Sequence, residues 1–151
     1  MSVLSGAVRE VLRFLSGQEA LSGIVFCEDY PAARKDSPLR HVTVAIGLEQ
    51  ADCVPSALGR FLGEREGYAW SGYPWTLRMR LQIHAPNRLG GTACRETFER
   101  VWESLFFDAP FPITAAGCGD VTAHRETGAL RLNAWIELHL QACRAEGGER
   151  Q

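Results

Sequence analysis

The stretch from residue 130 to 141, LRLNAWIELHLQ, alternates almost perfectly between apolar and polar residues. One parity holds only Leu, Ala and Ile, and the other holds polar residues and a single tryptophan, Trp135. Because successive side chains of a strand point to opposite faces of a sheet, this pattern predicts a strand with one buried face and one wet face. Twelve residues would span roughly 40 Å at about 3.3 Å per residue, so the predicted strand is unusually long.

Period-two patterns predict four further strands, at residues 24–27, 41–48, 76–85 and 113–124. A polar loop that ends at Arg40 follows the first of them. Gly117 and Gly119 interrupt the strand at 113–124, which suits a bulge or a bend. Residues 125–128 then form a hairpin signal, with Gly128 where the turn needs a positive φ.

Two segments have a helical period. Apolar residues recur at the same helical offsets in residues 4–15 and in residues 94–105, which predicts one apolar stripe along each helix. The predicted stripes are Leu4, Val8, Val11, Leu12 and Leu15 in the first helix, and Cys94, Phe98, Val101, Trp102 and Leu105 in the second. The second helix follows two glycines, with Thr92 as its expected N-cap, and Pro110 limits its C-terminal extent. The two stripes predict that both helices lie on one surface.

Residues 49–75 have no clear period. The spacing suits a short helix at Pro55, Leu58, Phe61 and Leu62. Glycines and Pro74 favour irregular chain in the rest of the segment. We expect an ordered flap or contact loop here, because disordered linkers seldom hold many aromatic residues. Those of this segment are Tyr68, Trp70, Tyr73 and Trp75.

The order of elements predicts one α+β domain over residues 1–151, with an irregular aromatic-rich insertion at 49–75. Its sheet would be mixed or antiparallel, with about five strands, and the two main helices would pack on one face. A chain of 151 residues is long enough to bury such a core. The other face would carry the polar parity of two long strands, namely Arg78, Arg80, His84, Arg131, Trp135, Glu137 and His139.

This polar face has two interpretations. An antiparallel sheet can simply present one face to water. The length of the last strand and the tryptophan at its middle favour instead a surface that binds a partner. The polar loop at residues 28–40 offers a second contact, as a docking arm that projects from the sheet. Its candidate contact residues are Arg34, Lys35 and Asp36.

Composition and charge narrow the possible functions. Hydrophobic residues make up 46% of the chain and charged residues 23%, which is ordinary for a globular protein. The net charge of −2 favours neither nucleic acid nor an anionic membrane as a partner. No apolar run approaches the roughly 20 residues of a bilayer span, and the N-terminus lacks the layout of a signal peptide. We therefore expect a cytoplasmic protein.

Cysteines are the strongest candidates for chemistry. Cys94 falls in the first turn of a helix, where the helix dipole lowers a thiol pKa, but it also begins the apolar stripe, and burial is the stronger interpretation. Cys118 lies between glycines and would need a base. The nearest histidine in sequence, His124, would be about 20 Å away along a strand.

Known catalytic and binding motifs are missing from the sequence. It contains no GxSxG, HExxH, P-loop or GxGxxG pattern, and its five cysteines include no CxxC pair. We therefore predict a protein that is not an enzyme and that has neither a cofactor nor a metal site.

Several segments together resemble a known family. They are Tyr30-Pro31 in a polar loop, SPLRHVTVAIGLE after it, and IHAPNRLGGTACRETFERVWESL, which leads from a strand into a helix. A Gly-Cys-Gly strand, an acid/Thr/Gly turn and the long alternating strand complete the series. In order and spacing the chain resembles the small tail terminator (tail completion) proteins of phages and of phage-derived contractile particles. The resemblance covers most of the chain apart from residues 49–75.

The resemblance implies a structural protein that forms a ring of six copies, caps the tail tube and ends its polymerisation. Its partners would be copies of itself, the tail tube protein and, in contractile particles, the last sheath ring. In a complete phage it would also meet the head connector. Neither sequence-specific nucleic acid nor a membrane would be a partner, and assembly would take place in the cytoplasm of the bacterial host.

Two alternatives remain open from the sequence. The chain could be another connector or baseplate component of the same particles. It could also be a small cytosolic α+β enzyme or ligand-binding domain that uses Cys94 or Cys118.

Overall fold

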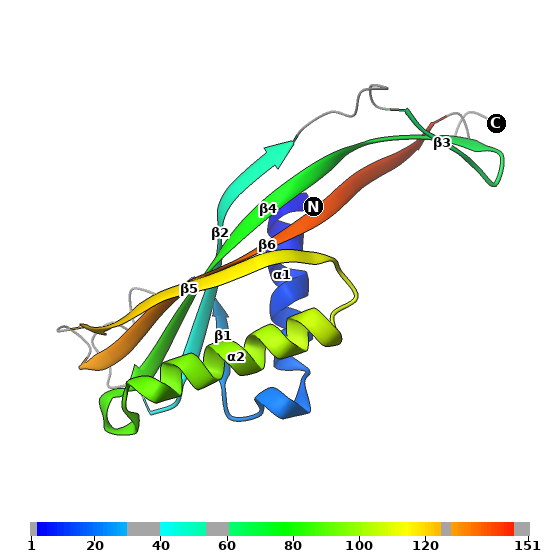
Figure 1. Ribbon diagram of the computed structural model, residues 1–151. Coiled ribbons are helices and arrows are strands. Elements are labelled where there is room, and N and C mark those ends of the chain that lie inside the picture. Colours follow the sequence, from blue (N-terminus) through cyan, green and yellow to red (C-terminus); the bar gives the residue numbers. More distant parts are fainter. Residues whose placement is uncertain (1–2, 30–39, 54–60, 125–127, 147–151) are drawn as a thin grey trace.

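The structure of the chain, a computed structural model, describes residues 3–29, 40–53, 61–124 and 128–146. The predicted α+β class is confirmed, with both helices on one side of a single mixed sheet (Figure 1). Neither described helix is long and apolar enough to cross a membrane. The elements are α1 (Val3–Ser16), η1 (Glu19–Leu21), β1 (Val25–Glu28), β2 (Thr43–Cys53), β3 (Phe61–Arg65), β4 (Tyr68–Pro86), η3 (Asn87–Leu89), α2 (Gly91–Phe107), β5 (Ile113–His124) and β6 (Ala129–Glu146).

The sheet has the strand order β1-β2-β4-β6-β5, and β3 pairs with β4 at one end. β1 and β2 are parallel, and the other pairs are antiparallel. The central pair is β4 with β6, in register from Ala69 opposite Glu146 to Pro86 opposite Ala129. The long strand predicted from the alternating pattern is therefore confirmed, and at 18 residues it is longer than predicted.

The predicted apolar parity forms the core. Met79 of β4 lies opposite Ile136 of β6, and Ile83 lies opposite Leu132, and all four side chains are fully buried. α1 lies against β1 and β2, whereas α2 lies against β4, β5 and β6. The helices contribute to this core Val8, Val11 and Leu15 of α1 and Cys94, Val101 and Leu105 of α2.

Two predicted details of α2 are wrong. The N-cap is Gly90 and not Thr92; Gly90 has φ 76°, and no side chain caps the helix. Trp102 lies beside the buried stripe, where it stacks on Phe106 with ring centroids 5.3 Å apart. Phe106 is itself 57% exposed, so this aromatic pair lies at the surface. The buried positions of α2 are Cys94, Thr97, Val101, Ser104 and Leu105.

The expected irregular insertion at residues 49–75 is wrong wherever the chain is described. Residues 49–53 continue β2, residues 61–65 form β3, and residues 68–75 are the first part of β4. Phe61 and Leu62 therefore lie in a strand and not in the expected short helix, of which residues 54–60 lie outside the described chain. The sheet gains its sixth strand from this segment.

β4 and β6 continue beyond the helices, as the upper right of Figure 1 shows. We call this projecting part the arm; it consists of residues 61–65 of β3, 68–75 of β4 and 139–146 of β6. The helices cover the rest of the sheet on one side (Figure 1). Most of the arm therefore lies beyond the helices, whereas Trp75 and Leu140 at its base pack against the core.

Candidate assembly interface

The predicted interface residues of the two long strands share the sheet face opposite the helices, which we call the polar face. The register makes them cross-strand neighbours, because consecutive residues of β4 and β6 alternate between the core and this face. The predicted parity is therefore confirmed. The opposed pairs are Arg78 with Glu137, Arg80 with Trp135, and His84 with Arg131, while His139 lies opposite Thr76.

Trp135 lies at the centre of the polar face between two strands. The guanidinium carbon of Arg78 lies 3.9 Å from the centroid of the indole, a cation–π contact. On the β5 side the indole approaches Gly117, where an added Cβ would come within 2.9 Å of three ring atoms. Gly117 therefore leaves room for the indole. The sequence predicted only a bulge at these glycines, and a register shift does follow between Cys118 and Val121.

Arg80 holds the chain that leaves β1. Its Nη2 lies 3.2 Å from Oδ1 of Asp29, and both side chains are exposed. The Asp29 carboxylate lies over Gly47 of β2, where any Cβ would overlap it. An exposed ion pair contributes about 1 kcal/mol or less, so this pair mainly orients the chain.

The polar loop at residues 28–40, predicted as a docking contact, is also bonded to the body at its other end. Nη2 of Arg88 donates a hydrogen bond of 3.1 Å to the carbonyl of Arg40. The three contact residues proposed between these two ends, Arg34, Lys35 and Asp36, lie outside the described residues. Their role in docking stays a prediction.

His84 is not the exposed interface residue that the alternation predicted. It is only 4% exposed, with Thr43 of β2 opposite it on one side and Arg131 of β6 on the other. Arg80, on the same strand and the same face, is exposed, so the burial of His84 is local to this end of β4. A direct contact between His84 and a partner is therefore excluded in this conformation, whereas His139 is exposed.

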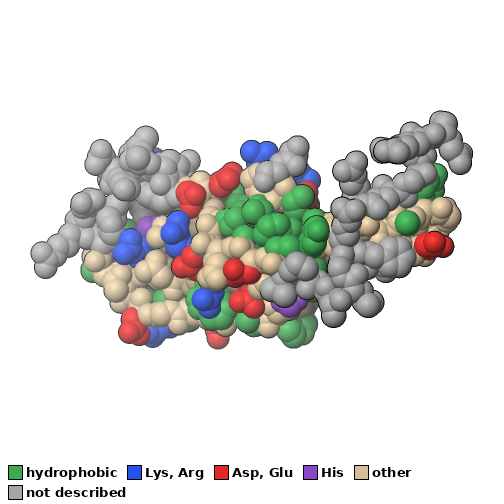
Figure 2. Space-filling model, turned by 90° about the horizontal axis from the view of Figure 1, so that it is seen from above, with side chains coloured by type: hydrophobic (Ala, Val, Ile, Leu, Met, Phe, Trp, Pro, Cys, Tyr) green, Lys and Arg blue, Asp and Glu red, His purple; other side chains and the backbone are tan. Residues whose placement is uncertain are grey.

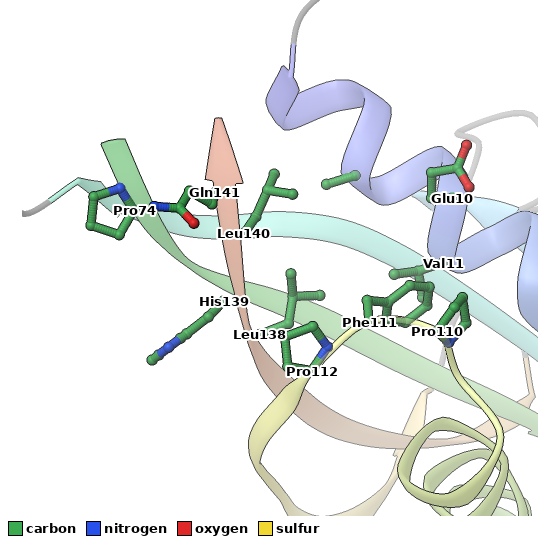
Figure 3. Close-up of a pocket in the computed structure, with 11 residues that line it drawn as sticks. Glu10, Val11, Pro74, Pro110, Phe111, Pro112, Leu138, His139, Leu140 and Gln141 are labelled. Atoms are coloured by element: carbon green, nitrogen blue, oxygen red, sulfur yellow. The ribbon is translucent and has the colours of Figure 1, made fainter. Parts of the chain in front are cut away.

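An apolar groove lies on the helix side of the sheet, where β6 enters the arm. Its volume is about 540 Å³. Figure 3 shows Leu138 and Leu140 pointing toward the α1 side, and His139 pointing to the opposite side of β6. The sequence did not predict this groove, although two prolines around Phe111 could have signalled a sharp exit from α2. Its apolar lining includes Ala7, Val11, Phe111, Pro112, Leu138 and Leu140.

Cys94 is buried in the core and has no features of a nucleophile. Its Sγ lies 3.8 Å from the carbonyl oxygen of Leu130 and 4.0 Å from that of Ile83. Burial raises the pKa of the Cys94 thiol, and a backbone hydrogen bond from Ala85 opposes this effect only in part. The thiol is therefore protonated at neutral pH.

The other candidates for chemistry in the described chain are Cys118 and possible metal ligands. Cys118 is exposed on β5, and His124, the nearest histidine in sequence, lies six residues further along the same strand. Among the residues that the structure describes, no group of three His, Cys, Asp or Glu side chains could hold a metal ion.

The surface has no large region of one charge sign in the view of Figure 2, as far as the chain is described. Basic and acidic side chains are interspersed, and hydrophobic side chains gather in one patch among them. Mixed charge around an apolar centre is typical of protein–protein interfaces.

The chain matches no protein-family model and no curated protein sequence. Its function is therefore inferred from its own residues. Two surfaces stand out: the polar face around Trp135, and the arm with the groove at its base.

Proposed function

We propose that the protein is a structural subunit that assembles into a ring of six copies and caps the tail tube of a phage or of a phage-derived contractile particle. The observation that carries the proposal is the arm. In it β4 and β6 run beyond the helices that cover the rest of the sheet (Figure 1). Strands that run beyond the layer covering the rest of their sheet gain stability when a neighbouring molecule packs against them.

A ring also needs two different contact surfaces on each subunit. In a head-to-tail contact one surface of a subunit meets another surface of the next copy, and rotation closes the ring. The arm is one such surface, and the polar face of the body is a second. The cation–π contact of Arg78 with Trp135 on the polar face supports this assignment, because arginine and tryptophan dominate the binding energy of many interfaces.

The proposal assigns no catalysis to the chain. The buried, protonated Cys94 weakens the enzyme alternative, and the mixed surface charge fits protein partners better than nucleic acid. The partners of the ring are its own copies, the tail tube protein and, in contractile particles, the last sheath ring.

Native mass and tube capping test the proposal. Six copies of 16.7 kDa give about 100 kDa by light scattering. We expect this mass for the purified chain, or for the chain mixed with tubes of the cognate tail tube protein, and rings at tube ends in electron micrographs. A chain that stays monomeric and leaves tube length unchanged contradicts the proposal.

A further inference from the structure

The outer edge of β6 is open along the arm. β5 pairs with β6 from Ala129 as far as Leu138. From residue 140 to 146, β6 pairs only with β4, and no strand in the described chain occupies its other side. Seven residues at about 3.3 Å each give an open edge roughly 23 Å long.

The backbone groups on this edge can be assigned. The N–H of His139 donates a hydrogen bond of 3.3 Å to the carbonyl of Pro112, so it points to the β5 side. Backbone groups of a strand alternate in direction, and β4 and β6 stay in register without a bulge. The N–H and C=O groups of Gln141, Cys143 and Ala145 therefore also point to the open side.

No described segment of the chain fills this position. Pro110 and Pro112 precede β5, and neither residue has an N–H with which to extend the ladder. The apolar groove lies beside the prolines at the start of β5, next to Leu138 and Leu140 of β6 (Figure 3). A strand edge beside an apolar groove is the geometry of β-strand addition, in which backbone bonds give affinity and the groove takes side chains.

We infer that the β6 edge at residues 140–146 accepts an extended strand of a second copy of this chain. This inference rests on the proposed function, because the second copy is the neighbouring subunit of the ring. The chain offers a suitable donor, since the outer edge of β5 is unpaired over its 12 residues within the described structure. That edge has none of the Lys, Arg and Pro residues that commonly protect the edge strands of monomers, and its protection is limited to two register shifts against β6.

The chain also exposes apolar side chains of the kind that the groove would take. Phe106 and Phe107, at the end of α2, are 57% and 75% exposed and pack edge to face with centroids 5.0 Å apart. Large exposed aromatic residues are uncommon on a monomer without a partner. One chain thus carries an open acceptor edge, an open donor edge and apolar groups to fill the groove.

Proline substitutions in β6 distinguish an effect on assembly at the open edge from an effect on the stability of the subunit. Cys143→Pro removes an N–H that points to the open side, and Cys143→Ala is its matched control because it keeps that N–H. Ala142→Pro is the contrasting variant, since it removes an N–H that points to β4. We expect Cys143→Pro to melt close to Cys143→Ala, and Ala142→Pro to melt lower. We also expect Cys143→Pro to raise the concentration of half-assembly by roughly tenfold relative to Cys143→Ala.

Hydrogen exchange on the unmodified chain gives a second measurement that does not depend on how a variant folds. The amides of Gln141, Cys143 and Ala145 should exchange fast in the monomer and become protected in the assembly. Equal exchange in both states overturns the inference, as does a Cys143→Pro variant that assembles like Cys143→Ala. Rings that cap tubes with an unprotected edge overturn this inference alone, whereas a protected edge without tube capping overturns only the proposed function.

Discussion

Trp135 and Ile136 are adjacent in β6, and the sheet gives them opposite surroundings. Ile136 is fully buried under the helices, so Ile136→Ala should lower the free energy of unfolding by about 2–5 kcal/mol. Trp135 lies half-buried on the polar face against Arg78, so Trp135→Ala should cost roughly 1 kcal/mol and impair ring formation. Denaturant unfolding and native mass of both variants measure the difference. A Trp135→Ala variant that unfolds easily yet associates normally contradicts the role of the polar face.

A methyl group added at Gly117 tests whether the Trp135 indole needs the space that this glycine leaves. Gly117→Ala brings a Cβ within 2.9 Å of Trp135 and should destabilise the fold by about 1–3 kcal/mol. In a Trp135→Ala background the same substitution should be close to neutral, a coupling that a double-mutant cycle measures. Gly119→Ala is the control, because its Cβ would meet only the Asn133 carbonyl, at 3.7 Å. Equal costs at the two glycines would show that the indole does not need this space.

Cys94 gives the stability a pH dependence of known sign. Burial raises its pKa in the folded chain, so its contribution is complete below the ordinary thiol pKa of about 9 and is lost as pH rises through the folded value. The free energy of unfolding of the wild type should therefore fall more steeply between about pH 8 and pH 10 than that of Cys94→Ala. The exposed Cys118→Ala variant should keep the wild-type slope. Identical slopes in wild type and Cys94→Ala would contradict the burial of the thiol.

The spacing of apolar residues along the chain predicted most of the helices and strands, because each long element buries one side. The strands with a clean alternation, such as 76–85 and 130–141, are present with the predicted parity. The first half of β4 escaped prediction because Gly72 and Pro74 are untypical of a central strand. The structure tolerates Pro74 because its nitrogen faces the gap between β2, which begins pairing at Trp75, and β3, which ends at Ser71.

The candidate interface was predictable only in part, for a related reason. The parity of one strand assigns side chains such as Arg78 and Trp135 to a face. It does not say where a neighbouring strand stops, so neither the open edge of β6 nor the burial of His84 follows from it. The open edge depends on pairing between segments far apart in the sequence, because β5 begins at Ile113 opposite Leu138. The burial of His84 depends on its surroundings in the folded chain, which the alternation of one strand does not show.

The arm edge and the polar face of the molecule should respond differently to salt. Exposed ion pairs contribute about 1 kcal/mol or less and are screened, whereas backbone hydrogen bonds and apolar contacts are not. If the arm edge dominates assembly, raising the ionic strength from about 0.05 to about 0.5 M should change the concentration of half-assembly by less than roughly tenfold. Light scattering across a salt series measures this. A much stronger dependence would assign the main contact to the charges of the polar face, which Arg131→Glu and His139→Glu would then confirm.

The central ladder of the sheet also constrains how the chain folds. Leu77 and Leu138 are opposed in the sheet but distant in sequence, so closing this pair costs loop entropy before its contacts form. During synthesis β4 leaves the ribosome long before β6. Until β6 is made, the edge of β4 that will pair with it has no partner strand. Residues 91–128, which include α2 and β5, must be made while β4 waits for its partner. The arm also contains the end of β6 and is therefore completed last. A subunit thus becomes competent to associate only after β6 has paired with β4.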